Sequence, residues 1–144
     1  MENEAKEYSQ KYVVGWESHQ EPARAGKRSN NMPSKRWGHS MVVYRHYVYL
    51  FGGSLSNNYS LSSQTVYSFD LKAWGETGWD RYLAPEHECC PSGRDGHSAS
   101  VIGSCMFIIG GSKGDSQCNE VYSFDFRSLK CTLFLSRVSK TDLW

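Results

Sequence analysis

The sequence predicts an all-β fold made of two similar units of four strands. Short runs of β-branched and aromatic residues are separated by turn-forming residues, as in β-hairpins. One ordered set of these runs occurs twice along the chain. The composition supports a packed core, because 5 Trp, 9 Tyr and 6 Phe accompany only 22% charged residues. Disordered chains, in contrast, have few aromatic residues and a large net charge.

The chain carries almost no net charge. Its 16 basic and 15 acidic residues give +1 at pH 7, so it lacks the broad positive surface that binds nucleic acid or an anionic membrane. No run approaches the ~20 apolar residues of a membrane span, and the polar, acidic start does not resemble a secretory signal. We therefore expect a cytoplasmic protein whose 5 Cys are reduced thiols, with neither a membrane nor a nucleic acid as its partner.

Residues 1–33 are expected to form a polar N-terminal segment with one candidate strand, at residues 12–16. The rest of the segment gathers Pro, Gly and Asn, the composition of a loop or linker. The stretch from Arg24 to Arg36 is basic and contains no acid. We interpret it as a solvated loop that enters the first unit. The alternatives are a nuclear-import signal, which would place the protein in the nucleus, or a phosphate-contacting arm.

The first unit is predicted to span residues 34–91. Its first two strands, 41–44 and 47–51, are separated by two residues, the layout of a tight hairpin. A third strand is predicted at 66–70 and a fourth at 79–83, each preceded by a polar or glycine-containing turn.

The second unit repeats this arrangement over residues 92–136 and is followed by a tail at 137–144. The equivalent residues are 58 positions apart in the first half of each unit and 55 apart in the second half. The three-residue difference falls within one polar loop, where surface connections tolerate changes in length. Examples of equivalent pairs are His39 and His97, Gly52 and Gly110, and Tyr67 and Tyr122.

In each unit a basic residue precedes Gly-His-Ser, and a hairpin, a Gly-Gly pair and a Val-Tyr-Ser-Phe-Asp strand follow in that order. In the order of these motifs, each unit resembles a kelch repeat. The resemblance covers residues 34–135 and implies two four-stranded antiparallel blades of a β-propeller. The second unit departs from the pattern because no Trp precedes its fourth strand. The resemblance implies structural roles for Arg36, His39, Gly52, Gly53, Tyr67, Trp79, Arg94, His97, Gly110, Gly111 and Tyr122.

Several of these residues also have a chemical interpretation. His39 and His97 are candidates for a catalytic or metal-binding pair, but each follows a glycine at the start of a hairpin, where an imidazole can bond a backbone or tyrosine oxygen. We therefore interpret both as structural. Arg36 and Arg94 are interpreted as hydrogen-bonded braces at the blade edges, with an anchoring role in an interface as the alternative.

The sequence contains no strong signal for catalysis or metal binding. The cluster at residues 87–90, His-Glu-Cys-Cys, lacks the Cys-x₂₋₄-Cys spacing of zinc sites. Neither a P-loop, nor Gly-x-Ser-x-Gly, nor His-Glu-x-x-His occurs in the sequence. We therefore expect a non-enzymatic protein without catalytic residues, metal or cofactor. The alternative is a fragment of a propeller enzyme, such as one resembling copper oxidases.

The resemblance implies a protein-interaction module, such as an adaptor or scaffold, that binds a partner protein through the loops between its strands. The expected loops are residues 54–64, 84–92 and 112–119. The candidate partner-binding residues in them are Asn57, Asn58, Tyr59, His87, Lys113 and Asp115.

The chain length sets a further expectation. Its 144 residues suit one domain, yet they hold only two blades, whereas closed propellers have ~4–8. We therefore expect either further blades in a longer protein or self-association that completes a ring.

Overall fold

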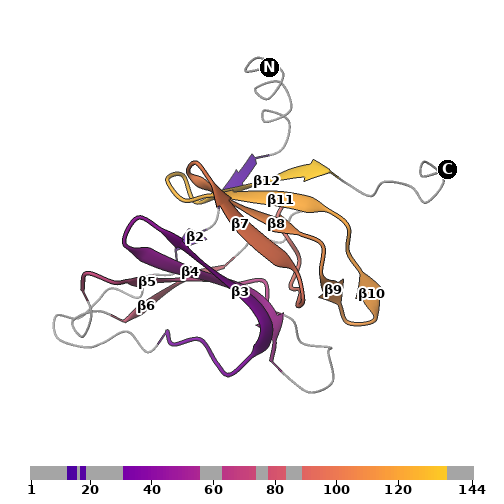
Figure 1. Ribbon diagram of the computed structural model, residues 1–144, viewed down its shortest axis with the longest axis horizontal. Coiled ribbons are helices and arrows are strands. Elements are labelled where there is room, and N and C mark those ends of the chain that lie inside the picture. The colour runs from indigo at the N-terminus through magenta and orange to yellow at the C-terminus, as the bar shows by residue number, and fades with distance from the viewer. Residues whose placement is uncertain are drawn as a thin grey trace, which may run out of the picture.

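The computed structural model shows an all-β protein, as predicted (Figure 1). It describes residues 13–15, 17–18, 31–55, 63–73, 78–83 and 89–135; the first two ranges, Leu83 and Leu135 are described by their backbone only. The regular secondary structure in these residues consists of β-strands alone. Among them, no helix is long and apolar enough to cross a membrane.

The first repeat forms a sheet of four antiparallel strands. They are β3 (Trp37–Tyr44), β4 (Tyr47–Ser54), β5 (Val66–Asp70) and β6 (Trp79–Leu83). The sheet order is β2-β6-β5-β4-β3, in which the short strand β2 (Glu17–Ser18) pairs with β6. The N-terminal segment therefore adds a fifth strand to the predicted four.

The second repeat forms an equivalent sheet. It contains β7 (Ser98–Ile102), β8 (Cys105–Ile109), β11 (Val121–Asp125) and β12 (Lys130–Leu135). Here β1 (Val13–Gly15), within the segment where a strand was predicted, pairs with β12 as the fifth strand. A separate hairpin of β9 (Ser112–Lys113) and β10 (Ser116–Gln117) extends the connection between β8 and β11. The N-terminal segment thus pairs with the last strand of both repeats.

The first hairpin is longer than predicted. Its ladder runs past residue 51 to the pair Trp37 and Ser54, so β3 starts four residues before the predicted strand. The two-residue turn is as predicted, and Arg45 adopts a φ of 57° there. The equivalent position in the second repeat is Gly103, with a φ of 61°, a conformation that glycine adopts without strain.

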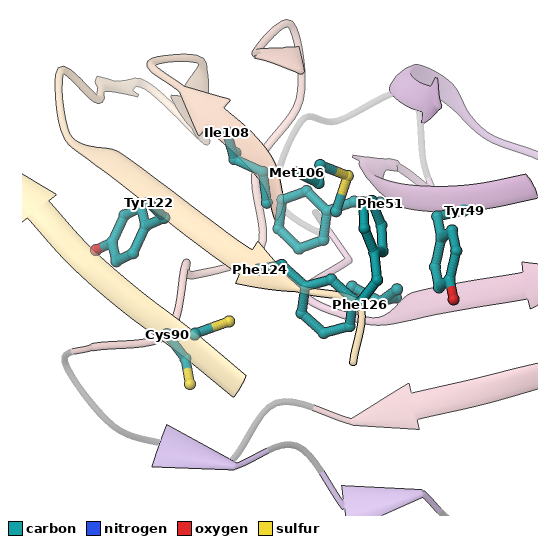
Figure 2. Packing of buried hydrophobic residues seen from close by; sticks show 10 residues of the cluster. Tyr49, Phe51, Cys90, Met106, Ile108, Tyr122, Phe124 and Phe126 are labelled. Carbon is teal, nitrogen blue, oxygen red and sulfur yellow. The ribbon is translucent and has the colours of Figure 1, made fainter. Parts of the chain in front are cut away.

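The core lies between the two sheets (Figure 2). The rings of Tyr44 and Phe126 stack with their centroids 4.5 Å apart, and those of Tyr49 and Phe126 are 4.4 Å apart. Phe51, Met106 and Phe124 are completely buried in the same cluster. The two sheets therefore pack face to face, and two sheets alone do not close a ring.

Candidate functional site

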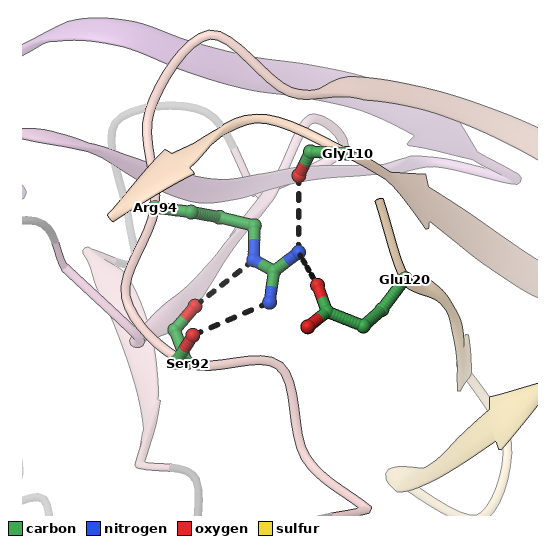
Figure 3. A network of polar contacts seen from close by, with 4 residues as sticks. All are labelled: Ser92, Arg94, Gly110 and Glu120. Carbon is green, nitrogen blue, oxygen red and sulfur yellow. Dashed lines mark hydrogen bonds and ion pairs between the residues drawn. The ribbon is translucent and has the colours of Figure 1, made fainter. Parts of the chain in front are cut away.

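Arg94 braces the start of the second repeat (Figure 3). Its guanidinium donates to the carbonyl oxygen of Gly110 at 3.0 Å and to the carbonyl and hydroxyl oxygens of Ser92 at 3.2 and 3.3 Å. The side chain is 1% exposed and forms an ion pair with Glu120 at 3.4 Å. Its charge is therefore compensated inside the protein, and it ties the Gly-Gly turn to the preceding loop.

Arg36 makes the same set of contacts one repeat earlier. It donates to the carbonyl oxygen of Gly52 at 3.0 Å, and to the carbonyl and hydroxyl oxygens of Ser34 at 3.1 and 3.3 Å. Each arginine also lies 5.0 Å above a tyrosine ring, Arg36 over Tyr67 and Arg94 over Tyr122. The arrangement has the geometry of a brace in both repeats. The two braces differ in one partner: Glu120 forms an ion pair with Arg94, and the equivalent position in the first repeat is Thr65.

The Gly52–Gly53 pair lies where the first sheet approaches the second. Gly52 has a φ of +70°, and a Cβ there would sit 2.5 Å from the carbonyl oxygen of Arg94. Gly53 has a φ of +89° and donates its N–H to the same oxygen at 2.8 Å. Only glycine allows this approach of one backbone to another. The equivalent Gly110 and Gly111 have φ values of +64° and +94°.

His97 is buried between the two sheets, whereas His39 is exposed. Nε2 of His97 and Oγ of Ser40 are 2.7 Å apart, so the hydrogen bond joins the two repeats. Burial, together with the charge of nearby Arg94, lowers the pKa of His97 to about 4. The two histidines thus occupy different environments. Among the described residues, no three His, Cys, Asp or Glu side chains gather in a group that could hold a metal ion.

The three predicted aromatic motif residues lie on the central and outer strands of the repeats. Tyr67 and Tyr122 are buried at equivalent positions of β5 and β11, and burial raises the pKa of Tyr122. Trp79 begins β6, as predicted for the fourth strand of the first repeat. Its ring packs against Phe69, with centroids 5.3 Å apart, and edge-on against Tyr67.

The comparison with known families agrees with this geometry. A family model described as the KLHDC2/KLHL20/DRC7 Kelch-repeats domain matches residues 2–140. The chain belongs to the kelch-repeat family. The resemblance stated from the motifs is confirmed, and the two sheets are kelch blades: blade 1 comprises β3 to β6, and blade 2 comprises β7, β8, β11 and β12.

Curated relatives share the kelch region over part of their length. The chain is 36% identical over 104 residues to the leucine-zipper-like transcriptional regulator 1 homolog of Drosophila melanogaster, covering 70% of this chain and 10% of the relative. It is 31% identical over 111 residues to human Kelch domain-containing protein 3, covering 75% and 27%. It is 29% identical over 103 residues to tip elongation aberrant protein 3 of Schizosaccharomyces pombe, covering 69% and 9%. The chain thus matches only a minor part of each relative.

The connections predicted to bind a partner leave the kelch blades at one common end, which we call the loop end. Phe51, Val66 and Tyr82 are neighbours across β4, β5 and β6, so the chain leaves β4 and β6 and enters β5 at the same end of the sheet. Gly53 contacts Arg94 of blade 2, and Asp95 pairs with Ser112, which places the corresponding end of blade 2 beside it.

The β9–β10 hairpin is the predicted loop that the structure describes in full. Lys113 in β9 and Asp115 in its turn are both exposed. The base of the hairpin is fixed, because Ser112 and Asp95 exchange two backbone hydrogen bonds of 3.0 and 2.8 Å. Cys118 adds a bond to the carbonyl oxygen of Gly111 at 2.8 Å. Asn57, Asn58, Tyr59 and His87 lie outside the described residues.

Reasoning from the sequence missed three contributors to this region. Ser40 and Glu120 were not singled out, although they partner His97 and Arg94. The blade count had indicated that each repeat needs a neighbour on both sides, but the individual apolar side chains of the uncovered faces, including Val43, Ile102 and Ile109, were not named. A signal for the last group was present: both alternating faces of the hairpin strands carry apolar residues, the pattern of a sheet covered on two sides.

Proposed function

We propose that this chain is a non-enzymatic protein-interaction module that binds a partner protein through the loop end of its kelch blades. Membership of the kelch-repeat family supports the proposal, since such domains generally mediate protein–protein interaction. Within this proposal the chain serves as an adaptor or scaffold in the cytoplasm. The partner, this role and the location are predictions.

The observation that carries the proposal is the β9–β10 hairpin. It presents exposed Lys113 and Asp115 on a base held by the Ser112–Asp95 bridge. The adjacent residue Arg94 is locked by its bonds to Gly110 and Ser92. A rigid base under exposed polar residues lowers the entropy lost on binding, which favours recognition of another protein.

The enzyme alternative receives no support from the relatives described above. Their names specify a transcriptional regulator, a kelch domain and a tip-elongation phenotype, and none specifies a reaction. The function that the site supports best is therefore binding.

The experiment compares three forms of the chain in a quantitative affinity purification followed by mass spectrometry. The test variant reverses both hairpin charges, Lys113→Glu with Asp115→Lys, at positions that are exposed and thus tolerant of change. The control is Lys72→Glu. Lys72 is also exposed, but it lies in the turn that follows β5, at the opposite end of the sheet from the loop end.

We expect one or more proteins to be recovered with the unchanged chain and with the Lys72 variant, and to be lost with the hairpin variant. Binding of the purified partner, measured by calorimetry, should weaken by about tenfold or more when both charges are reversed, because like charges then face each other across the interface. Equal recovery with all three forms would exclude the hairpin from the binding site.

A further inference from the structure

The two blades pack through opposite faces. Blade 1 contributes its trailing face, defined by Val42, Tyr44, Tyr49 and Phe51, and blade 2 its leading face, defined by Ala99, Val101, Met106 and Ile108. Four aromatic contacts cross the junction: Tyr44 with Phe126, Tyr49 with both Phe124 and Phe126, and Phe51 with His97. The remaining two faces, the leading face of blade 1 and the trailing face of blade 2, have no blade against them in the described chain.

These two open faces carry the equivalents of the residues that pack in the junction. On the trailing face of blade 2, Ile102 and Ile109 stand at the positions of Tyr44 and Phe51 and are 66% and 46% exposed. On the leading face of blade 1, Val43 stands at the position of Val101 and is 57% exposed. Leu71, at the position of Phe126, is 40% exposed. These exposed apolar side chains are therefore the counterparts of residues that the chain already buries in the junction.

The backbone groups of the junction are also repeated at the open ends. Across the junction, Gly53 N–H donates to Arg94 O, and Gly96 N–H donates to Gly38 O, each at 2.8 Å. The equivalent donor on blade 2 is Gly111 N–H, and the equivalent acceptor on blade 1 is Arg36 O. Neither of these groups has a hydrogen-bond partner among the described residues. Blade 2 thus offers a backbone donor, and blade 1 an acceptor, of the kind that pair across the junction.

The glycines of the two blades differ in how closely other atoms approach them. A Cβ on Gly52 would meet Arg94 O at 2.5 Å and His97 Cε1 at 2.7 Å, whereas a Cβ on Gly110 would meet only Cys118 O, at 3.3 Å. A Cβ on Gly38 would meet Asp95 Cβ at 3.0 Å, whereas one on Gly96 would meet nothing within 4 Å. No described residue therefore fills, beside blade 2, the space that blade 2 fills beside blade 1.

The side-chain hydrogen bond of the junction has an unused counterpart as well. Ser40 and His97 join the blades, and their equivalents are Ser98 and His39. Both are exposed, and neither forms a side-chain hydrogen bond to another described residue. Ser98 lies on the blade whose trailing face is open, and His39 on the blade whose leading face is open. They are placed to pair between two chains.

We propose that copies of this chain associate head to tail, with the trailing face of blade 2 docked on the leading face of blade 1 of the next copy. A second copy is the occupant because this chain itself carries every matching group: the apolar side chains, the backbone donor and acceptor, and the Ser–His pair. In the docked pair, Ile102 packs on Leu71 of the next copy, and Ser98 bonds His39. Such an interface is heterologous, and it closes at about two to four copies if the ring has ~4–8 blades.

The first test is the mass of the purified chain in solution. Light scattering after size exclusion and sedimentation velocity, over a wide range of protein concentration, should show a discrete species at a small multiple of 16.4 kDa. A monomer at every concentration would overturn the proposal. Aggregates without a defined size would overturn it too, because a closed head-to-tail ring has a fixed number of copies.

The second test uses charges that can compensate each other. Ile102→Lys and Leu71→Glu are made separately and together in one chain; both positions are exposed, so each monomer should still fold. Each single variant should associate about tenfold or more weakly, because a charge is buried without a partner. The double variant should recover association, since the new Lys and Glu then meet at every head-to-tail contact.

The control for this test is Leu55→Lys. Leu55 is 43% exposed, and its equivalent in blade 2 is Lys113 on the β9–β10 hairpin, so it belongs to neither open face. This variant should associate like the unchanged chain. The proposal is overturned if the single variants associate as strongly as the control. It is also overturned if the double variant does not regain the association of the unchanged chain. That result is expected of a two-fold symmetric contact, in which the same residues of the two copies meet. Circular dichroism checks that all four variants are folded.

Discussion

The hydroxyl of Ser40 and Nε2 of His97 lie 2.7 Å apart and join blade 1 to blade 2 across 57 residues of sequence. The other ring nitrogen, Nδ1, is buried without a hydrogen-bond partner. A protonated imidazole would therefore place an unpaired donor and a charge in the junction, close to the charge of Arg94. The neutral ring is the form that the folded protein accommodates.

The first prediction concerns the pH dependence of stability. The pKa of His97 is lowered from 6.5 to about 4, by burial first and by Arg94 second. Its stabilising contribution is complete above pH 6.5 and is lost as the pH falls toward 4, because the unfolded chain binds a proton that the folded chain does not. At pH 5 the loss is about 2 kcal/mol of the free energy of unfolding. Urea unfolding at pH 7 and pH 5 measures it.

The control for this prediction is His97→Gln, which keeps a side chain able to bond Ser40 and does not titrate. Its free energy of unfolding should fall less between pH 7 and pH 5 than that of the unchanged chain. Identical losses in the two proteins would show that His97 is not the group responsible.

The second prediction concerns the braces. Arg94→Lys should lower the free energy of unfolding by about 2 to 3 kcal/mol, because an ammonium group cannot reproduce the fork that reaches Gly110, Ser92 and Glu120 together. Arg36→Lys is the matched control. It loses the equivalent backbone bonds but is less buried and forms no ion pair with an acid among the described residues, so it should cost roughly half as much. Chemical denaturation of both variants tests the order, and an equal cost would contradict it.

The third prediction compares equivalent phenylalanines. Phe124 is completely buried against blade 1, and Phe124→Ala should cost about 3 to 5 kcal/mol through lost burial and the cavity left behind. Phe69, its equivalent, is half-buried on the open face and contacts Trp79. Phe69→Ala should cost about 1 to 2 kcal/mol in the monomer, because less surface leaves water on folding. Thermal and urea unfolding measure the difference, and similar costs would mean that the two positions are equally buried.

The repeat spacing explains why much of the fold could be predicted. Arg36 and Arg94 occur at the same point of two similar segments, and local hydrogen bonds to the preceding serine and the following glycine recur with them. Contacts within a repeat follow from the repeat itself. The hairpin at Arg45 was predictable for the same reason, since strand runs two residues apart leave a tight turn as the connection.

Contacts between distant parts of the chain could not be predicted in this way. The pairing of β1 with β12 joins Val13 to Thr132, and a strand of three residues carries no pattern that names its partner. The Ser40–His97 bond depends on how the blades pack, and the same motif leaves His39 exposed. Identical residues in the two repeats therefore have different environments, according to which side has a neighbouring blade.

The last prediction uses this difference between the repeats. Gly52 and Gly110 both have a positive φ, so replacing either with Ala adds strain of roughly 1 to 2 kcal/mol. Gly52→Ala adds a clash, because its Cβ would sit 2.5 Å from a backbone oxygen of blade 2, whereas the nearest atom to a Cβ on Gly110 is 3.3 Å away. Gly52→Ala should therefore lower the free energy of unfolding by ~2 kcal/mol more than Gly110→Ala. Urea unfolding at low protein concentration, where copies are apart, measures the pair. At high concentration, Gly110→Ala should in addition weaken association between copies, because a methyl group there enters the space that the next blade would fill. Equal unfolding free energies for the two variants would mean that the second blade does not press on Gly52.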